Sequence, residues 1–247
     1  MKAEWGFRPI RTKVGGTPTP LTDKAPIAAG TVIEMFELVK ISVGTGVVAL
    51  GAINIDGTDA LYVAGKKSTS SDTFTEIPLY GGSQTLFMVA VKEIAEGTVL
   101  TATGGSGTTF VDSSLVIADG TYGNDLLKGA VLEVDSCASG DASDGDELTL
   151  TGYTASSGTC TFASVGSTGF TSGDKAHFTK LGTHIFGAYS LGIEYSGSDD
   201  TDGCRLQLDG GDGSSRAVRV VGWNDARTKL IVQIIASPDQ AIATQDT

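Results

Sequence analysis

The side chains best suited to chemistry in this sequence are two histidines and a large excess of carboxylates. His177 and His184 are seven positions apart in AHFTKLGTHIF. If this segment forms one strand, the odd separation places the two side chains on opposite faces, which is poor geometry for a shared metal ion. The sequence contains no G-x-S-x-G, H-E-x-x-H or phosphate-binding P-loop motif. We therefore expect no enzymatic activity, no metal site and no cofactor.

Two acidic stretches have the composition of calcium loops. ASGDASDGDE (138–147) and GSDDTDGC (197–204) crowd oxygen ligands beside glycines, and oxygen is the ligand that Ca²⁺ prefers. Neither stretch has EF-hand spacing, because the third and fifth positions from Asp141 are Ser143 and Gly145. We expect these carboxylates at solvated loop tips, and calcium binding stays an alternative.

The three cysteines do not form a recognisable framework. Cys137, Cys160 and Cys204 are an odd number, and no C-x-x-C pair is present. Neither a zinc site nor a set of disulfides is therefore predicted. We expect reduced and mostly buried thiols, with a Cys137–Cys160 disulfide as the open alternative.

The elements that must carry these side chains are predicted to be strands. The chain of 247 residues contains 34 glycines, and glycine destabilises a helix interior by about 1 kcal/mol per position. Apolar runs such as FTEIPLY, TLFMVAV and KGAVLEV recur with turn residues between them, as in an antiparallel barrel or sandwich. TVIEMFELVKISV (31–43) is predicted to be one strand. GVVALGAINI and ALYVAG, joined through Asp56-Gly57, predict a hairpin.

Changes in composition predict four segments in an all-β chain. Residues 135–212 hold twelve acidic and only three basic residues, whereas SRAVRVVGW and TKLIVQIIAS near the C-terminus read as a basic strand pair. The predicted segments are an extended N-terminal arm (1–26), a β-barrel or sandwich domain (27–134) completed by strands within 214–237, an additional small acidic β-hairpin module or insertion (135–213), and a polar tail (238–247).

The first residues differ in charge from the rest of the chain. Residues 1–24 carry five of the 17 Lys and Arg and only two of the 29 Asp and Glu, so this segment is positively charged. The protein as a whole has a net charge of −12. Four of the six prolines lie within residues 1–26, and proline removes an amide donor. Trp5, Phe7 and Ile10 would gain nothing in a solvated tail. We therefore expect an irregular arm whose conformation depends on the surface of a partner.

Charge and hydropathy also limit the class of partner. A net charge of −12 disfavours nucleic-acid binding, which depends on cations that neutralise phosphates. The longest apolar runs are shorter than the roughly 18 residues of a membrane helix, and no signal peptide is visible. We expect no nucleic acid and no membrane among the partners, and synthesis in a cytoplasm.

Both ends of the chain resemble the capsid decoration (cement) proteins of tailed bacteriophages. The opening Gly6-Phe7-Arg8-Pro9-Ile10-Arg11 is similar to their G-F-R-P-[VI]-R segment. It is followed by Gly15-Gly16 and then by Ile27-Ala28-Ala29-Gly30, as in that family. Arg219-Val220-Val221-Gly222-Trp223 and Leu230-Ile231-Val232-Gln233-Ile234 resemble the closing strands of the family. The acidic middle of the chain has no counterpart in it.

The resemblance implies a structural virion protein on the outer capsid surface, a homotrimer that binds the major capsid protein across coat subunits. In this interpretation Trp5 and Phe7 fill apolar pockets of the coat, Arg8 and Arg11 pair with its carboxylates, and Pro9 limits the ordering entropy of the arm. Ile10 completes the predicted capsid-binding set. The alternative function is a β-rich virion spike or adhesin that binds host-surface glycans, with or without calcium.

Overall fold

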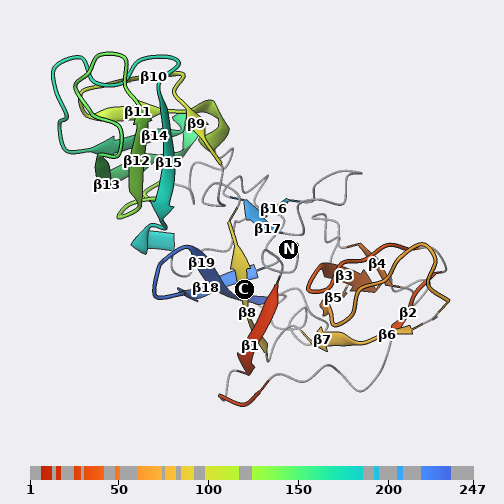
Figure 1. Ribbon diagram of the computed structural model, residues 1–247. Helices are drawn as coiled ribbons and strands as arrows, with labels where there is room; N and C mark the ends of the chain where they lie inside the picture. The colour runs from red at the N-terminus through yellow and green to blue at the C-terminus, as the bar shows by residue number, and fades with distance from the viewer. Residues whose placement is uncertain are drawn as a thin grey trace.

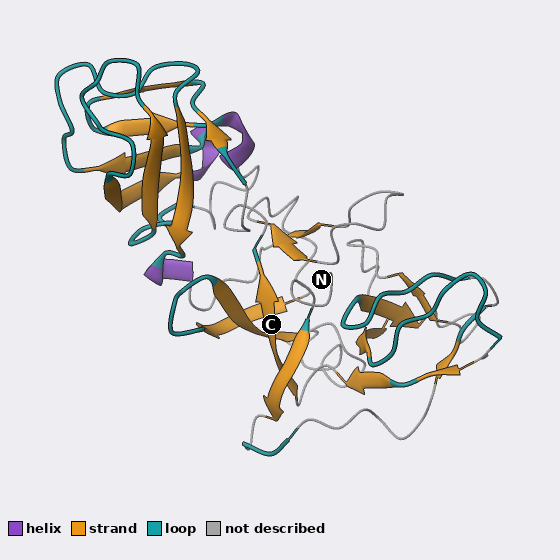
Figure 2. Cartoon of the chain, viewed as in Figure 1, coloured by secondary structure: helices purple, strands orange, loops and turns teal. Residues whose placement is uncertain are grey.

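The computed structural model of the chain is all-β, as the sequence predicts (Figures 1 and 2). The regular elements are short strands that pair antiparallel and single-turn 3-10 helices. None of the helices in the part of the chain that the structure describes is long and apolar enough to cross a bilayer. The described residues are 7–12, 15–17, 25–28, 31–41, 48–50, 60–73, 76–81, 85–91, 98–116, 124–185, 192–194, 205–207 and 218–234.

A four-stranded sheet at the centre of the molecule joins both ends of the chain to its middle. Its strands, in spatial order, are β1 (Arg8–Thr12), β8 (Thr85–Ala90), β19 (Lys229–Ile234) and β18 (Val218–Trp223). Alternate residues of these strands are apolar, and a period of two places them on one face. That face is buried. The predicted C-terminal strand pair is confirmed as β18 and β19, and it joins β8 of the 27–134 segment as expected.

Two small sheets form a second lobe. The larger contains β4 (Val48–Leu50), β3 (Leu38–Ile41), β5 (Ala60–Ala64) and β7 (Leu79–Gly81). The smaller pairs β2 (Ala25–Pro26) with β6 (Glu76–Ile77). Buried residues between them make a core of their own, with Ile33, Val39, Ala64, Ile77 and Leu79 as members.

Two predictions about this lobe are wrong. The turn of the predicted Asp-Gly hairpin lies outside the described residues. The described ends of its two strands, β4 and β5, do not pair, because β3 lies between them and pairs with both. An Asp-Gly sequence indicates that the chain reverses its direction, but it does not determine which strands pair. A third strand can lie between the two and form hydrogen bonds with both. The strand predicted over 31–43 begins only at Leu38, because Phe36 adopts a left-handed backbone with a φ of 70° that no extended strand can include.

A curled seven-stranded sheet forms the third lobe (Figure 1). Its strands, in spatial order, are β10 (Gly104–Ser106), β11 (Thr109–Val111), β14 (Thr159–Phe162), β13 (Glu147–Thr154), β12 (Val131–Ser136), β15 (Lys175–Lys180) and β9 (Leu100–Thr101). Phe170 packs edge-on against Phe110 and Phe162, with ring centroids 5.3 and 5.6 Å apart. The sheet therefore closes over an aromatic core.

The boundary predicted between residues 134 and 135 is wrong. It falls inside β12, and β9, β10 and β11 belong to the same sheet as the strands of the acidic segment. The described strands of the acidic segment therefore belong to a sheet that starts before the segment. The acidic composition does not mark an insertion.

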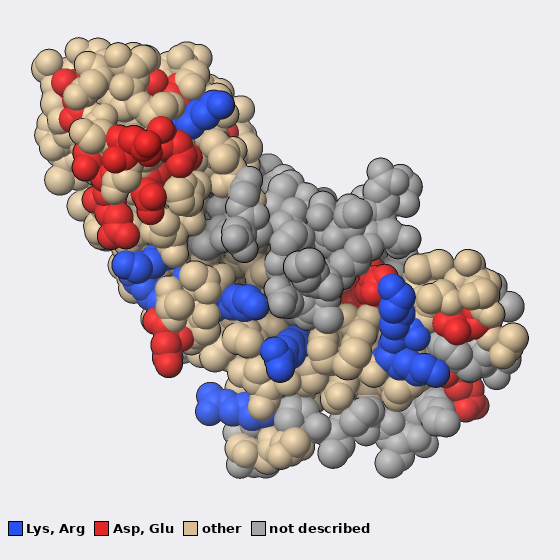
Figure 3. All heavy atoms as spheres, in the orientation of Figure 1, with Lys and Arg blue, Asp and Glu red and all other residues tan. Residues whose placement is uncertain are grey.

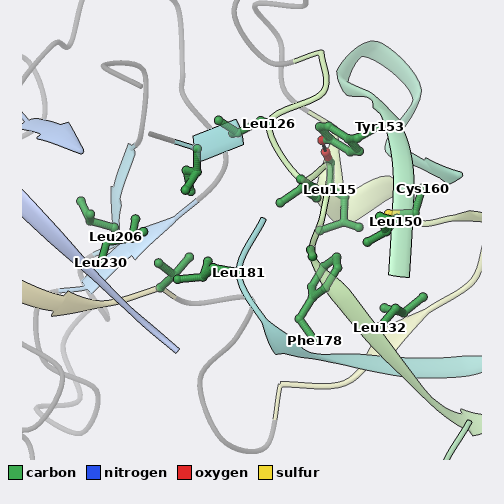
Figure 4. Packing of buried hydrophobic residues seen from close by; sticks show 14 of the residues in the cluster. Leu115, Leu126, Leu132, Leu150, Tyr153, Cys160, Phe178, Leu181, Leu206 and Leu230 are labelled. Atoms are coloured by element: carbon green, nitrogen blue, oxygen red, sulfur yellow. Dashed lines mark hydrogen bonds between the residues drawn. The ribbon is translucent and has the colours of Figure 1, made fainter. Parts of the chain in front are cut away.

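The central sheet and the seven-stranded lobe share one hydrophobic cluster. Figure 4 shows Leu206 and Leu230 on one side, Leu181 between, and Phe178 and Leu132 beyond. Leu206 belongs to β17 (Arg205–Gln207), which pairs with β16 (Gly192–Glu194).

The backbone also joins these two parts of the molecule. The Leu181 N–H donates to the Arg227 carbonyl at 2.7 Å, and Arg227 Nη1 donates to the Gly129 carbonyl at 3.3 Å. The turn between β18 and β19 is thereby fixed to the lobe.

Candidate functional site: the outer face of the central sheet

The segment predicted to be an irregular arm forms a strand of the molecule's own central sheet over Arg8–Thr12. The Phe7 ring is fully buried and meets Phe87 edge-on at a centroid distance of 6.3 Å. The Phe7 N–H donates to the Phe36 carbonyl at 2.8 Å. The prediction that Phe7 fills a pocket of a partner is therefore wrong for this structure, because its own core holds the ring. Trp5 lies outside the described residues.

A β-bulge sets the direction of the two arginines of β1. Arg8 pairs with Met88 and Arg11 with Leu86, and the register shifts between Pro9 and Arg11. Residues three apart in a regular strand point to opposite faces, but the extra residue at the bulge brings Arg8 and Arg11 to the same face. Both are exposed. Proline lacks an amide donor, so a bulge at an edge strand accommodates it well. Pro9 and Ile10 are half-buried.

The pairing register aligns these arginines with residues from the C-terminal strands. One row across the sheet is Arg11, Leu86, Gln233 and Arg219, and the next is Arg8, Met88, Ile231 and Gly222. Lys229 lies on the same face opposite Ala90. We call this surface the basic face, defined by Arg8, Arg11, Met88, Arg219, Lys229 and Ile231. Met88 and Ile231 form a half-buried apolar centre between the cations.

A second charged surface crosses three strands of the seven-stranded sheet. Glu147 of β13, Glu133 of β12 and His177 of β15 form one row. Asp135 Oδ1 lies 2.9 Å from His177 Nδ1, and Glu133 Oε2 lies 4.0 Å from His177 Nε2. We call this surface the acidic face, defined by Glu133, Asp135, Glu147 and His177. The cross-strand pair of glutamates is a like-charge contact, which weakens an antiparallel pair.

His177 and His184 do not meet in the structure. His177 lies on β15, whereas His184 is exposed in the 3-10 turn Thr183–Ile185. Within the residues that the structure describes, no hydroxyl or thiol hydrogen-bonds to His177, whose only such contact is to Asp135. The described neighbours of His177 are therefore the carboxylates Asp135 and Glu133.

Two carboxylates of the first predicted calcium stretch accept backbone N–H groups of the protein itself. Asp141 Oδ2 accepts the N–H groups of Gly169 at 2.7 Å and Thr168 at 2.8 Å, and Asp146 Oδ2 accepts the Ser143 N–H at 2.7 Å. No group of three or more metal-ligating side chains occurs among the described residues. The second stretch, 197–204, lies outside them.

The hydrogen bonds of the Asp141 carboxylate should make the stability of the protein depend on pH. The amide of Gly169, and next that of Thr168, lowers the pKa of Asp141 below its ordinary value of 3.8. Folding thus favours the ionised form, so its stabilising contribution is present at neutral pH and is lost as the pH falls through the lowered pKa. We expect Asp141→Asn to have a lower Tm than the wild type at about pH 7, and the difference to vanish toward about pH 2.

Thermal unfolding monitored by circular dichroism across this pH range measures the effect. Asp144→Asn is the control, since Asp144 is an exposed carboxylate of the same loop. A Tm difference for Asp141→Asn that is the same at every pH would contradict the role of the charge.

The cysteines that the structure describes are free thiols. Cys160 is buried, and burial, with a smaller contribution from the charge of Asp112, raises its pKa to about 12. A thiol with so high a pKa is a poor nucleophile at neutral pH. Cys137 is partly exposed and is not joined to Cys160, so the alternative of a disulfide between them is wrong. Cys204 lies outside the described residues.

Comparison of the chain with protein-family models, with curated proteins and with solved structures gave no match.

Proposed function

We propose that this protein decorates the outer surface of a tailed-bacteriophage capsid by binding the major capsid protein across coat subunits. The observation that supports the proposal is the shared, exposed orientation of Arg8 and Arg11 on β1. In the G-F-R-P-I-R segment Phe7 fixes the strand in the molecule's own sheet, and the two arginines face solvent. The segment thus acts as a preformed binding edge instead of a loose arm.

Fixed arginines are well suited to this work. A guanidinium binds a carboxylate through two parallel hydrogen bonds, which gives orientation as well as energy. Because β1 is held by β8 along its length, binding does not have to order the backbone, and the entropy cost of association falls. The homotrimeric state and the contribution of Trp5 remain predictions. Nothing in the described residues favours the alternative function as a glycan-binding adhesin.

Charge reversal on β1 tests the proposal. We expect Arg8→Glu/Arg11→Glu to weaken binding to empty coat shells of the encoding phage by at least about tenfold, because opposite charges at the contact become like charges. Co-sedimentation with purified shells measures the bound fraction. The control is Lys66→Glu/Lys67→Glu, which changes the net charge equally at exposed residues of another lobe. Because Lys67 pairs with Glu34 at 2.6 Å, circular dichroism is used to show that this variant is folded. If both variants bind as the wild type does, the proposal is wrong.

A further inference from the structure

We propose that the basic face of one molecule docks on the acidic face of a second copy of this chain. The contact uses the same arginines as the proposed coat contact, and the purified protein tests it in the absence of coat shells. Its occupant follows from charge complementarity between two surfaces of the same molecule. Arg8 and Arg11 supply cations on one of them, and Glu133, Asp135 and Glu147 supply carboxylates on the other.

Each surface carries charges with no oppositely charged lysine, arginine or carboxylate beside them in the described part of the molecule: the two arginines of β1 on one, and three carboxylates on the other. Within that part, no carboxylate lies within ion-pair distance of Arg8 or Arg11, and no lysine or arginine lies within that distance of Glu133, Asp135 or Glu147. Lys175 is the nearest cation along β15, where it pairs across to Ser136 and Thr101. Glu133 therefore faces Glu147 with only the His177 ring on its other side. An external cation would relieve this like-charge contact.

The geometry favours contact between two molecules over contact within one. Figure 3 shows lysines and arginines over the central sheet and carboxylates gathered on the seven-stranded lobe in a single view. The two surfaces lie on different sheets of the molecule, and a second copy can present its acidic face to the basic face of the first. Each copy carries both surfaces, so a pair of molecules still has one free basic face and one free acidic face. Further copies can bind there through the same contact.

The composition of the basic face fits a protein surface. Met88 and Ile231 place a half-buried apolar centre between the arginines of β1 and Arg219 of β18. An apolar centre with a charged rim is the usual anatomy of a protein interface. Burial of the apolar centre supplies affinity, and the charges select the orientation.

Complementary charge reversal tests the contact. Sedimentation velocity of the full chain is measured over a concentration series at about 50 and about 300 mM NaCl. We expect wild-type self-association that weakens at least about tenfold at the higher salt concentration. Arg8→Glu/Arg11→Glu alone and Glu133→Lys/Glu147→Lys alone should each lose association. An equimolar mixture of the two variants should regain it, since each reversed face then meets a reversed partner.

Two outcomes would overturn the inference. One is a wild-type protein that stays monomeric at low salt up to about millimolar concentration, the weakest range of specific binding. The other is a mixture of the two variants that associates no more than either alone. Lys66→Glu/Lys67→Glu should associate as the wild type does, and circular dichroism confirms that each variant is folded. If the wild-type protein binds coat shells but does not self-associate, this inference is wrong and the proposed function stands. If it self-associates but does not bind coat shells, the proposed function is wrong and this inference stands.

Discussion

Replacement of Asp174 by alanine is expected to lower the free energy of unfolding by about 3–4 kcal/mol. The Asp174 side chain is 3% exposed and lies just before β15. Its Oδ1 accepts the Ala138 N–H at 2.8 Å, and its Oδ2 accepts the N–H and the hydroxyl of Thr171 at 2.7 and 3.1 Å. One carboxylate thus joins the loop that follows β12 to the turn that precedes β15. Alanine leaves two amides without an acceptor inside the lobe.

Urea denaturation of the full chain measures this effect. Asp144→Ala serves as the control, because Asp144 is an exposed carboxylate of the same lobe and its loss should change stability by no more than about 0.5 kcal/mol. Equal stability of the two variants would show that the hydrogen bonds of Asp174 contribute nothing beyond those of a surface acid.

The strands that sequence reasoning located best are those with one buried face. Buried Val218 and Val220 flank the exposed Arg219 in β18. In β19, buried Leu230 and Val232 flank the half-buried Ile231. A period of two is visible in the sequence because burial on one face requires it. The domain boundary predicted between residues 134 and 135 was wrong for a related reason. Acidic composition reflects which side chains meet water, and it contains no information about which strands pair.

The basic face could not be predicted from the sequence alone. Arg8 and Arg11 are three positions apart, which in a regular strand would separate them, and the bulge that unites them depends on the pairing of β1 with β8. Arg219 reaches the same row only through the register of three strand pairs. Pro9 was the available signal, since a proline within a strand indicates an edge or a bulge. The partner of the strand is set by tertiary packing.

Phe7→Ala is expected to lower the free energy of unfolding of the isolated protein by about 3–5 kcal/mol, the usual cost of removing a fully buried phenylalanine. For a chain of this length, that loss lowers the Tm by about 10 °C. Phe7 is 0% exposed, contacts Phe87, and belongs to the same cluster as the core of the central sheet. If Phe7 were instead exposed in the free protein and buried only in a pocket of a partner, its side chain would contribute nothing to the stability of the free chain.

Scanning calorimetry of the purified protein decides between these two roles of Phe7. Ile10→Ala is the matched control within β1, because Ile10 is only half-buried and should cost about 1 kcal/mol. Loss of the Phe7 ring should also release β1 from β8, and with it the common orientation of Arg8 and Arg11. Phe7→Ala should therefore lower the stability of the protein and also weaken binding through the basic face. Arg8→Glu/Arg11→Glu should weaken that binding without lowering the stability. A Phe7 variant as stable as the wild type would contradict the burial of the ring and return the segment to the role of a free arm.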